Sequence, residues 1–116
     1  MIEEKIEVLK TADEYIYKLV DGINKLVEYM RGGEEEEGMR YLSLVSDGLL
    51  WIIDTIEVTK DLYKDKINIE EINTKLNEVV EAVENEDYIL IGDLFSYEIL
   101  PMLENIHGKI RDIILN

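Results

Sequence analysis

The chain contains no cysteine, and it has only one histidine and one proline among its 116 residues. Without cysteine it has no disulfide, no thiolate metal ligand and no cysteine nucleophile. Its serines fall inside predicted helices, away from the sharp strand-to-helix turn on which serine nucleophiles lie. The glycine pair at residues 32–33 lacks the spacing and the lysine of a phosphate-binding loop. These absences predict a protein that is not an enzyme and binds no cofactor.

Basic residues are scarce as well. The chain has 12 Lys and Arg residues against 27 Asp and Glu residues, which gives a net charge of −15, and neither Lys nor Arg occurs between Lys75 and Lys109. Such a surface repels phosphate backbones and anionic lipid headgroups. Nucleic-acid and membrane binding are therefore not expected, whereas a basic protein segment would be attracted.

Long hydrophobic runs are also missing. The most apolar stretch, Leu49–Ile53, is far shorter than the roughly 20 residues needed to cross a bilayer. Residues 1–7 alternate charged and apolar side chains and lack the features of a secretory signal peptide. The sequence accordingly predicts a soluble, cytoplasmic protein.

The feature that dominates the chain is helical periodicity. Hydrophobic residues make up 47% of the sequence, enough for one packed domain over residues 1–116. They recur at steps of three and four, the spacing of one helix face, and no segment shows the alternation of a strand. Because the connections are short, this pattern predicts an all-α, up-down-up-down bundle of four helices. The predicted helices cover residues 2–30, 36–63, 69–84 and 88–115.

Several local signals mark the helix ends. The glutamates at 34–37 are either the acidic first turn of the second helix or a solvated linker, and the sequence leaves both open. Residues 64–67 break the periodicity. Asn68 and Asp87 are the predicted N-caps of the third and fourth helices. Pro101 is predicted to kink the fourth helix, because proline removes one backbone hydrogen bond.

The second predicted helix is unusually apolar around its circumference. Beside its main apolar stripe it carries a second one that includes Tyr41 and Trp51. A helix with so little polar surface needs neighbours on most sides, either within the chain or across a homodimer. Excess apolar surface of this kind is typical of a groove for a partner helix, so Tyr41 and Trp51 are candidate protein-binding residues.

Two glycines lie in equivalent surroundings on the first and second predicted helices. Asp21-Gly22 and Asp47-Gly48 are each followed by apolar residues at matching positions, at an offset of 26 residues. Glycine inside a helix costs about 1 kcal/mol relative to alanine, so the pair suggests a compensating gain such as close helix approach. Chance similarity between amphipathic helices is the competing interpretation.

An acidic stretch closes the third helix and continues into the next turn. It consists of Glu78, Glu81, Glu84, Glu86 and Asp87. One interpretation is a docking face for a basic protein segment, since charge complementarity speeds and orients association. The other is an ordinary solvated helix face, which charge runs usually form.

Glu104 and His107 are the only pair that resembles a metal-ligand motif. A Glu and a His one turn apart share a helix face, as in the carboxylate-bridged di-metal bundles. Those sites need a second such motif, and the chain has a single histidine. A metal-binding or enzymatic bundle centred on this pair is therefore kept only as an alternative, and no metal site is predicted.

Two segments carry a resemblance to a known group of proteins. The run NEDYILIGDLFSYEILPML at 85–103, together with DGLLWIID at 47–54, resembles a family of small, acidic, uncharacterised helical proteins of low-GC Gram-positive bacteria. That resemblance implies an all-helical bacterial protein but no activity or site. The size, acidity and helix pattern are also similar to those of bundle-type flagellar and type III export chaperones, in architecture only.

These observations together predict a non-enzymatic, chaperone- or adaptor-like bundle that binds a protein partner through an apolar groove flanked by acidic residues. The partner would supply a basic or amphipathic helical segment, and a homodimer is a further expectation. The alternative is an acidic mimic or immunity-type inhibitor that covers a basic protein surface.

Overall fold

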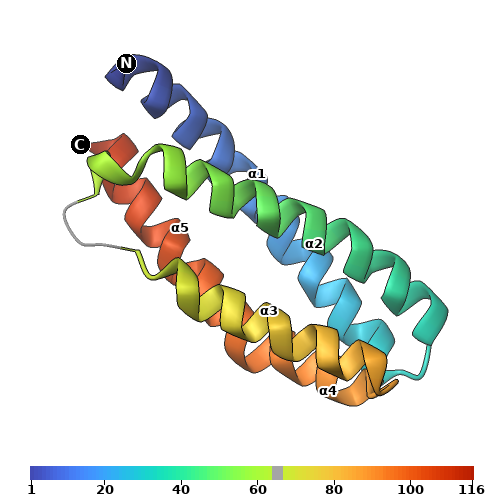
Figure 1. Ribbon diagram of the computed structural model, residues 1–116. Coiled ribbons are helices and arrows are strands. Elements are labelled where there is room, and N and C mark those ends of the chain that lie inside the picture. The colour runs from blue at the N-terminus through green and yellow to red at the C-terminus, as the bar shows by residue number, and fades with distance from the viewer. Residues whose placement is uncertain (64–66) are drawn as a thin grey trace.

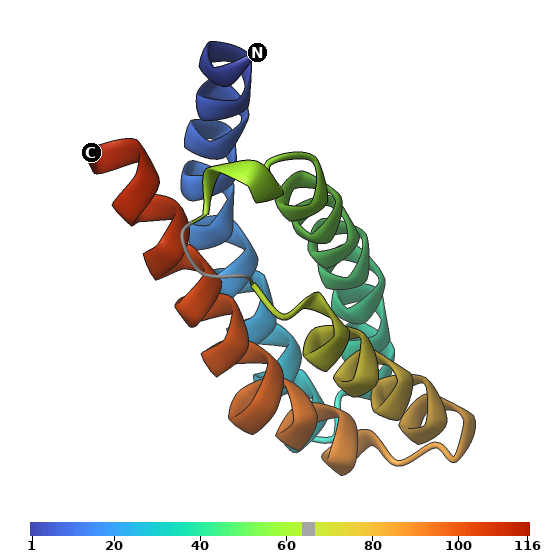
Figure 2. The same ribbon diagram turned by 60° about the vertical axis from the view of Figure 1, so that its left-hand side comes forward.

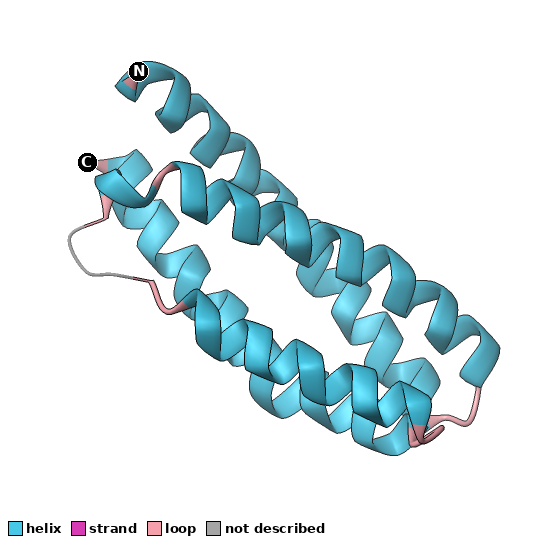
Figure 3. Cartoon of the chain, viewed as in Figure 1, coloured by secondary structure: helices cyan, strands magenta, loops and turns pink. Residues whose placement is uncertain are grey.

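The computed structural model describes residues 1–63 and 67–116, and all regular structure in these residues is helical (Figures 1 and 3). The three parts after residue 87 follow one another without a break and form one bent rod, so four helices pack against one another. The predicted all-α, four-helix fold is confirmed. The elements are α1 (Ile2–Arg31), α2 (Glu35–Val58), the 3-10 turn η1 (Lys60–Leu62), α3 (Ile69–Glu84), α4 (Tyr88–Leu94), the π-helical turn η2 (Phe95–Ile99) and α5 (Leu100–Leu115).

Helix α1 is the central element of the bundle. It packs against α2 on one side and against α4 and α5 on the other, while α3 packs against α4. Figures 1 and 2 show α2 running antiparallel to α1, with the two chain termini at the same end. The molecule is elongated along the helices, with extents of 45 × 23 × 18 Å.

The core is built from the apolar face that the periodicity marks on each helix. On α1, Leu9, Ile16 and Ile23 are fully buried, and they belong to one core cluster with buried side chains of the other helices. Burial of each such side chain stabilises the fold by about 1.5–3 kcal/mol. The largest fully buried side chains are Phe95, Leu9, Ile16, Ile23, Leu26, Met30, Leu49, Ile52, Ile56, Ile91, Ile99 and Leu103.

The turn between α1 and α2 settles the role of the glutamate run. Gly33 takes the left-handed conformation (φ +76°), and the N–H of Glu34 donates to the carbonyl of Tyr29 at 2.9 Å. This is the hydrogen bond that closes a Schellman C-cap. Glu34 precedes α2, and the next three glutamates form the first turn of the helix, where they complement the positive end of its dipole.

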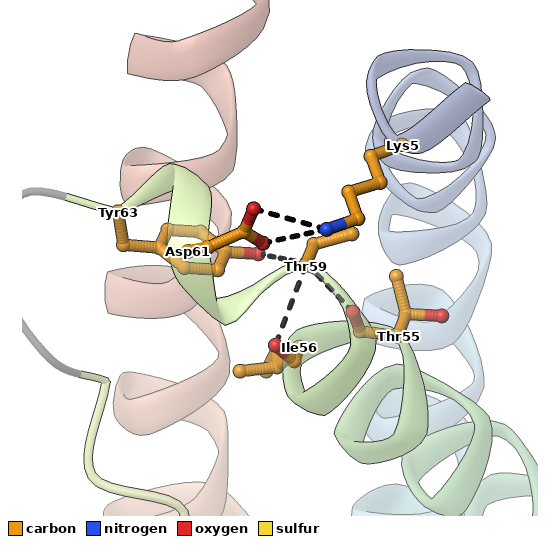
Figure 4. A network of polar contacts seen from close by, with 6 residues as sticks. All are labelled: Lys5, Thr55, Ile56, Thr59, Asp61 and Tyr63. Carbon is orange, nitrogen blue, oxygen red and sulfur yellow. Dashed lines mark hydrogen bonds and ion pairs between the residues drawn. The ribbon is translucent and has the colours of Figure 1, made fainter. Parts of the chain in front are cut away.

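The α2 helix ends at Val58, so the predicted end at residue 63 is wrong. The N–H of Thr59 is shared between the carbonyls of Thr55 (3.2 Å) and Ile56 (3.3 Å), which tightens the last turn and leads into η1. The buried Thr59 hydroxyl donates to the Thr55 carbonyl at 2.6 Å and lies 2.9 Å from the Tyr63 hydroxyl (Figure 4). A buried hydroxyl needs such partners, and here they compete with continued helix.

An ion pair joins this end of α2 to the start of α1. Lys5 donates to both carboxylate oxygens of Asp61, at 2.9 and 3.0 Å (Figure 4). The hydrogen bond from Lys5 lowers the pKa of the Asp61 carboxyl. The predicted break in periodicity at 64–67 begins just beyond, and its first three residues lie outside the described residues.

Both predicted N-caps are confirmed. The Asn68 side chain accepts from the N–H of Glu71 at 3.3 Å, and the Asp87 side chain accepts from the N–H of Leu90 at 3.2 Å. Each cap satisfies a backbone donor that would otherwise lack an intrahelical partner. The α3 helix accordingly covers the predicted residues 69–84.

The irregularity of the last helix lies in the turn directly before Pro101, the residue at which a kink was predicted. The N–H of Leu100 donates to the carbonyl of Phe95, five residues back, which defines the π-helical turn η2. Pro101 has no N–H for the carbonyl of Tyr97, and a widened turn before it accommodates the missing bond. Phe95 and Ile99 of this turn are buried in the core.

Candidate functional site

Two glycines lie at the contact between α1 and α2. A Cβ atom on Gly22 would lie 3.5 Å from Val45 Cγ2, so the helices already touch there. A Cβ atom on Gly48 would lie 3.0 Å from Leu19 Cδ1 and would collide with the Tyr15 hydroxyl. Glycine therefore lets Tyr15 of α1 lie across the backbone of α2, which is the close approach that the paired glycines suggested.

Above this contact the two helices form an apolar groove on the molecular surface. Its larger part has a volume of about 460 Å³ and is lined by Thr11, Tyr15, Leu44, Asp47, Gly48 and Trp51. A second depression of about 270 Å³ shares Tyr15 and Leu44 with the first and continues to Tyr41. We refer to the two together as the α1–α2 groove. All of its lining residues belong to α1 and α2.

The aromatic side chains of the groove hold one another in place. Tyr15 and Trp51 meet edge to face, with ring centroids 5.6 Å apart at 85°. Tyr41 is half-buried and packs against Tyr29 at 5.4 Å, and Arg40 lies over its ring at 4.9 Å. The two predicted binding residues on α2 thus line one continuous groove.

Large apolar side chains remain exposed along this face of α2. Leu44, Trp51 and Val58 are 55%, 39% and 62% exposed, and they are spaced seven residues apart. Residues at that spacing fall on one stripe of a helix, as in the seam of a coiled coil. The expected excess of apolar surface on the second helix is present as this stripe.

The charges that line the groove balance one another, unlike those of the whole chain. Lys18 and Lys25 of α1 and Asp21 and Asp47 face it. Lys25 pairs with Asp21 of its own helix at 3.5 Å. Within residues 1–63 and 67–116, neither Lys18 nor Asp47 has an ion-pair partner. Among the residues that the structure describes, the groove therefore has one unpaired charge of each sign, on opposite helices.

The chain belongs to the DUF8042 family. The matching family model, described as a domain of unknown function, covers residues 7–109 and so includes every lining residue of the α1–α2 groove. No match was found among curated proteins, and none among solved structures. Membership of an uncharacterised family agrees with the resemblance seen in the sequence, while its bacterial host group and the likeness to export chaperones stay predictions.

The predicted acidic residues lie on a different part of the bundle. Glu81, Glu84, Glu86 and Asp87 are exposed at the end of α3 and in the turn to α4. They do not line the α1–α2 groove, so the structure does not bring them together with Tyr41 and Trp51.

Glu78, the fifth predicted acid, is engaged within the fold. Lys75 lies 3.0 Å from Glu78 and 4.0 Å from Glu98 of η2. The Glu78 carboxylate at this distance raises the pKa of the Lys75 ammonium. Lys75 therefore links α3 to the rod formed by α4, η2 and α5, and Glu78 is part of that link. The exposed acidic surface consists of Glu81, Glu84, Glu86 and Asp87.

The turn between α3 and α4 has the same geometry as the turn after α1 but a different residue at its key position. The N–H of Asp87 donates to the carbonyl of Ala82 at 2.8 Å, and Glu86 takes the left-handed conformation (φ +54°). Glycine is favoured there because a Cβ atom costs about 1–2 kcal/mol in this region. Glu86 occupies this position in spite of that cost.

His107 makes a structural contact and not the one that its spacing from Glu104 suggested. Its Nε2 atom lies 2.7 Å from Asp13 of α1, and its ring meets Tyr17 edge to face at 4.8 Å. Arg111 donates to the Tyr17 hydroxyl at 3.0 Å. Glu104 is exposed. In the part of the chain that the structure describes, no three acidic or histidine side chains are grouped to hold a metal ion.

The groove residues of α1 were missed by sequence reasoning. Tyr15 and Lys18 lie outside the main apolar stripe of their helix and carry no motif. Only the Asp-Gly repeat pointed to this part of the helix pair. No helix in the described residues is both long and apolar enough to cross a membrane.

Proposed function

We propose that this protein is a non-enzymatic, protein-binding helical bundle whose α1–α2 groove accepts an amphipathic helix. The observation that carries the proposal is the exposed apolar stripe of Leu44, Trp51 and Val58 beside a preformed depression. An apolar groove between two helices is a common docking site for a helix that presents side chains at heptad-like spacing. Tyrosine and tryptophan in such grooves usually contribute most of the binding energy.

The groove is prepared for binding before any partner arrives. Gly48 leaves room for Tyr15, and Tyr15 in turn supports the ring of Trp51. Aromatic side chains that are already held in place lose little conformational entropy on binding. Such preorganisation favours recognition of a folded helix by the groove.

The chain offers a matched pair of variants to test this function. Leu44 lines the groove and is 55% exposed, whereas Leu50 lies on the same helix, is 54% exposed and does not line it. We expect Leu44→Asp to lose binding partners that the wild type and Leu50→Asp both retain in an affinity capture. Trp51 is the only tryptophan, so with purified partner its emission should shift to shorter wavelength.

Two results would contradict the proposal. One is capture of the same proteins by Leu44→Asp and Leu50→Asp. The other is a purified partner that binds without changing Trp51 emission or its quenching by iodide.

A second candidate function is docking of a basic protein segment on the exposed acidic surface. The observation that favours it is Glu86 at a position where glycine is preferred, beside Glu84 in the last turn of α3. Carboxylates at the negative end of a helix dipole are unfavourable, and residues that break local rules without a local gain often serve a function. This is the surface expected of an acidic mimic or inhibitor.

Salt dependence and charge removal distinguish this second function from groove binding. Binding of a basic partner should weaken steeply with salt and with Glu84→Gln/Glu86→Gln. The control Glu14→Gln/Glu28→Gln removes two exposed acids from α1. An equal effect of the two double variants would show that only net charge matters.

A further inference from the structure

The residues that line the α1–α2 groove indicate which helix would occupy it. We infer that the helix received by this groove is α2 of a second copy of the chain, in a two-fold symmetric dimer. The inference rests on the proposed function, because it names the helix that fills the same groove.

The first support is the charge distribution. Each chain carries a net charge of −15, so two copies repel one another over most of their surface. The groove is an exception, since its two lysines and two aspartates sum to zero. Two copies that meet through this face therefore bring together surfaces without net charge.

The second support is self-complementarity. Gly48 packs against Leu19 and Gly22 packs against Val45, so Asp47 and Lys18 lie at nearly the same height on antiparallel helices. A two-fold axis parallel to the helices places α1 of one copy over α2 of the other. Lys18 of each copy then faces Asp47 of the other, so this contact forms twice, as an isologous interface requires.

The other face-to-face arrangement is disfavoured by the same residues. A two-fold axis perpendicular to the helices would place α1 over α1 and α2 over α2. Lys18 would then lie on the same side of the interface as Lys18 of the other copy, and Asp47 on the same side as Asp47 of the other copy. Like charges opposed in this way cost binding energy. The charges therefore select both the face and the direction of the axis.

The third support is the apolar stripe. Leu44 and Trp51 line the groove opposite Tyr15, and Val58 continues their stripe along α2. In the parallel-axis dimer this stripe of each copy enters the groove of the other. Side chains spaced seven residues apart pack in this manner between antiparallel helices. The dimer covers the apolar surface that a monomer leaves in water.

Charge reversal on the full chain tests the inference. Sedimentation equilibrium from about 1 µM to about 1 mM should show a species of twice the chain mass at the upper concentrations, where the chain mass is 13.5 kDa. Lys18→Asp and Asp47→Lys should each weaken association by tenfold or more, on the order expected for close charge pairs. The double variant rebuilds both contacts with reversed polarity and should regain most of the affinity. Circular dichroism verifies that each variant is folded.

Trp51 gives an independent readout of the same event. Its emission should shift to shorter wavelength, and iodide should quench it less, as the wild-type concentration rises. Leu44→Asp should abolish both changes, whereas Leu50→Asp, which lies outside the groove, should keep them.

The outcomes separate this inference from the proposed function. A chain that stays monomeric at about 1 mM, with constant Trp51 emission, overturns the dimer. A different protein that binds in a Leu44-dependent manner would then still support the proposed function. A double variant as weak as the single ones also overturns the two-fold arrangement. A dimer that neither Leu44→Asp nor the charge reversals weaken forms through another surface, and this result also counts against the inference.

Discussion

The turn from α1 to α2 and the turn from α3 to α4 have the same backbone hydrogen bond. They differ in the residue that takes the left-handed conformation. Gly33 occupies the left-handed site after α1, and Glu86 occupies it after α3. Beyond the first turn the paired helices form an apolar face with balanced charges, whereas the second turn lies among carboxylates. The α1–α2 hairpin has the favoured glycine in its turn and leaves apolar surface exposed. The α3–α4 hairpin has a glutamate in its turn and exposes an acidic surface.

This difference suggests that the two hairpins have separate roles. In the α1–α2 pair the glycines serve the close approach of these two helices, and the groove above them is the proposed site for a further helix. The exposed acids of the α3–α4 pair offer charge and little shape. If both proposals hold, a dimer formed through α1 and α2 would present two acidic surfaces for a basic partner.

The largest expected effect comes from filling the notch at Gly48. Gly48→Val places branched atoms against Leu19 and Tyr15, and such overpacking should destabilise the fold by about 2–3 kcal/mol. Urea denaturation would measure the loss. Gly108 is the control, because nothing lies within 4 Å of its Cβ position. Gly108→Val should leave stability within about 0.5 kcal/mol of the wild type. Equal effects of the two variants would mean that Tyr15 does not depend on the notch.

The opposite side of α1 should give the next largest effect. His107→Ala removes the contact with Asp13 and leaves a partly buried carboxylate without that partner, which should cost about 1–2 kcal/mol. Asp13→Asn should cost a similar amount. A double-mutant cycle is the measurement, and a coupling energy near zero would show that the two side chains do not depend on each other.

Exchange of the turn residues tests the comparison between the two hairpins directly. Glu86→Gly should stabilise the protein by about 1 kcal/mol, because it relieves the cost of a side chain at positive φ. Glu86→Ala is the matched control, since it removes the charge but keeps the Cβ atom. Gly33→Ala should destabilise by about the same amount. Thermal unfolding would reveal whether the two turns respond with opposite sign. A stabilising effect of Glu86→Ala as large as that of Glu86→Gly would assign the cost to charge.

The smallest effect concerns the Lys5–Asp61 pair at the end of α2. Lys5 lowers the pKa of Asp61 in the folded state, so the pair adds stability above the ordinary aspartate pKa of about 3.9. That stability is lost as the pH falls through the lowered pKa. Asp61→Asn should therefore lower the unfolding midpoint slightly at neutral pH, and the difference should disappear in acid. A difference that is independent of pH would mean that the ion pair is not its source.

Much of the fold follows from local patterns that the sequence displays openly. The apolar spacing predicted four helices, and the caps at Asn68 and Asp87 predicted where two of them begin. These signals are local, because a helix face and a cap depend on residues within four positions of each other. The end of α2 was predicted five residues too late, since the buried partners of Thr59 depend on tertiary packing.

The candidate site was only half predictable. Tyr41 and Trp51 stood out as aromatics on a helix with too much apolar surface, and both line the groove. Their partners on α1 did not stand out, because Tyr15 and Lys18 line a groove only once α2 packs beside them. The acidic residues were also predicted to flank the groove, yet they lie on another helix pair.

Composition and periodicity by themselves determined that this chain is an acidic, cysteine-free bundle with more apolar surface on its second helix than one face can bury. Tertiary structure decided which helix covers which face. Pairing of α1 with α2 placed Gly48 beneath Tyr15 and left Leu44 and Trp51 at the surface. The physical reason is that a helix pattern states how much surface must be buried, whereas the partner that buries it depends on contacts between residues far apart in the chain.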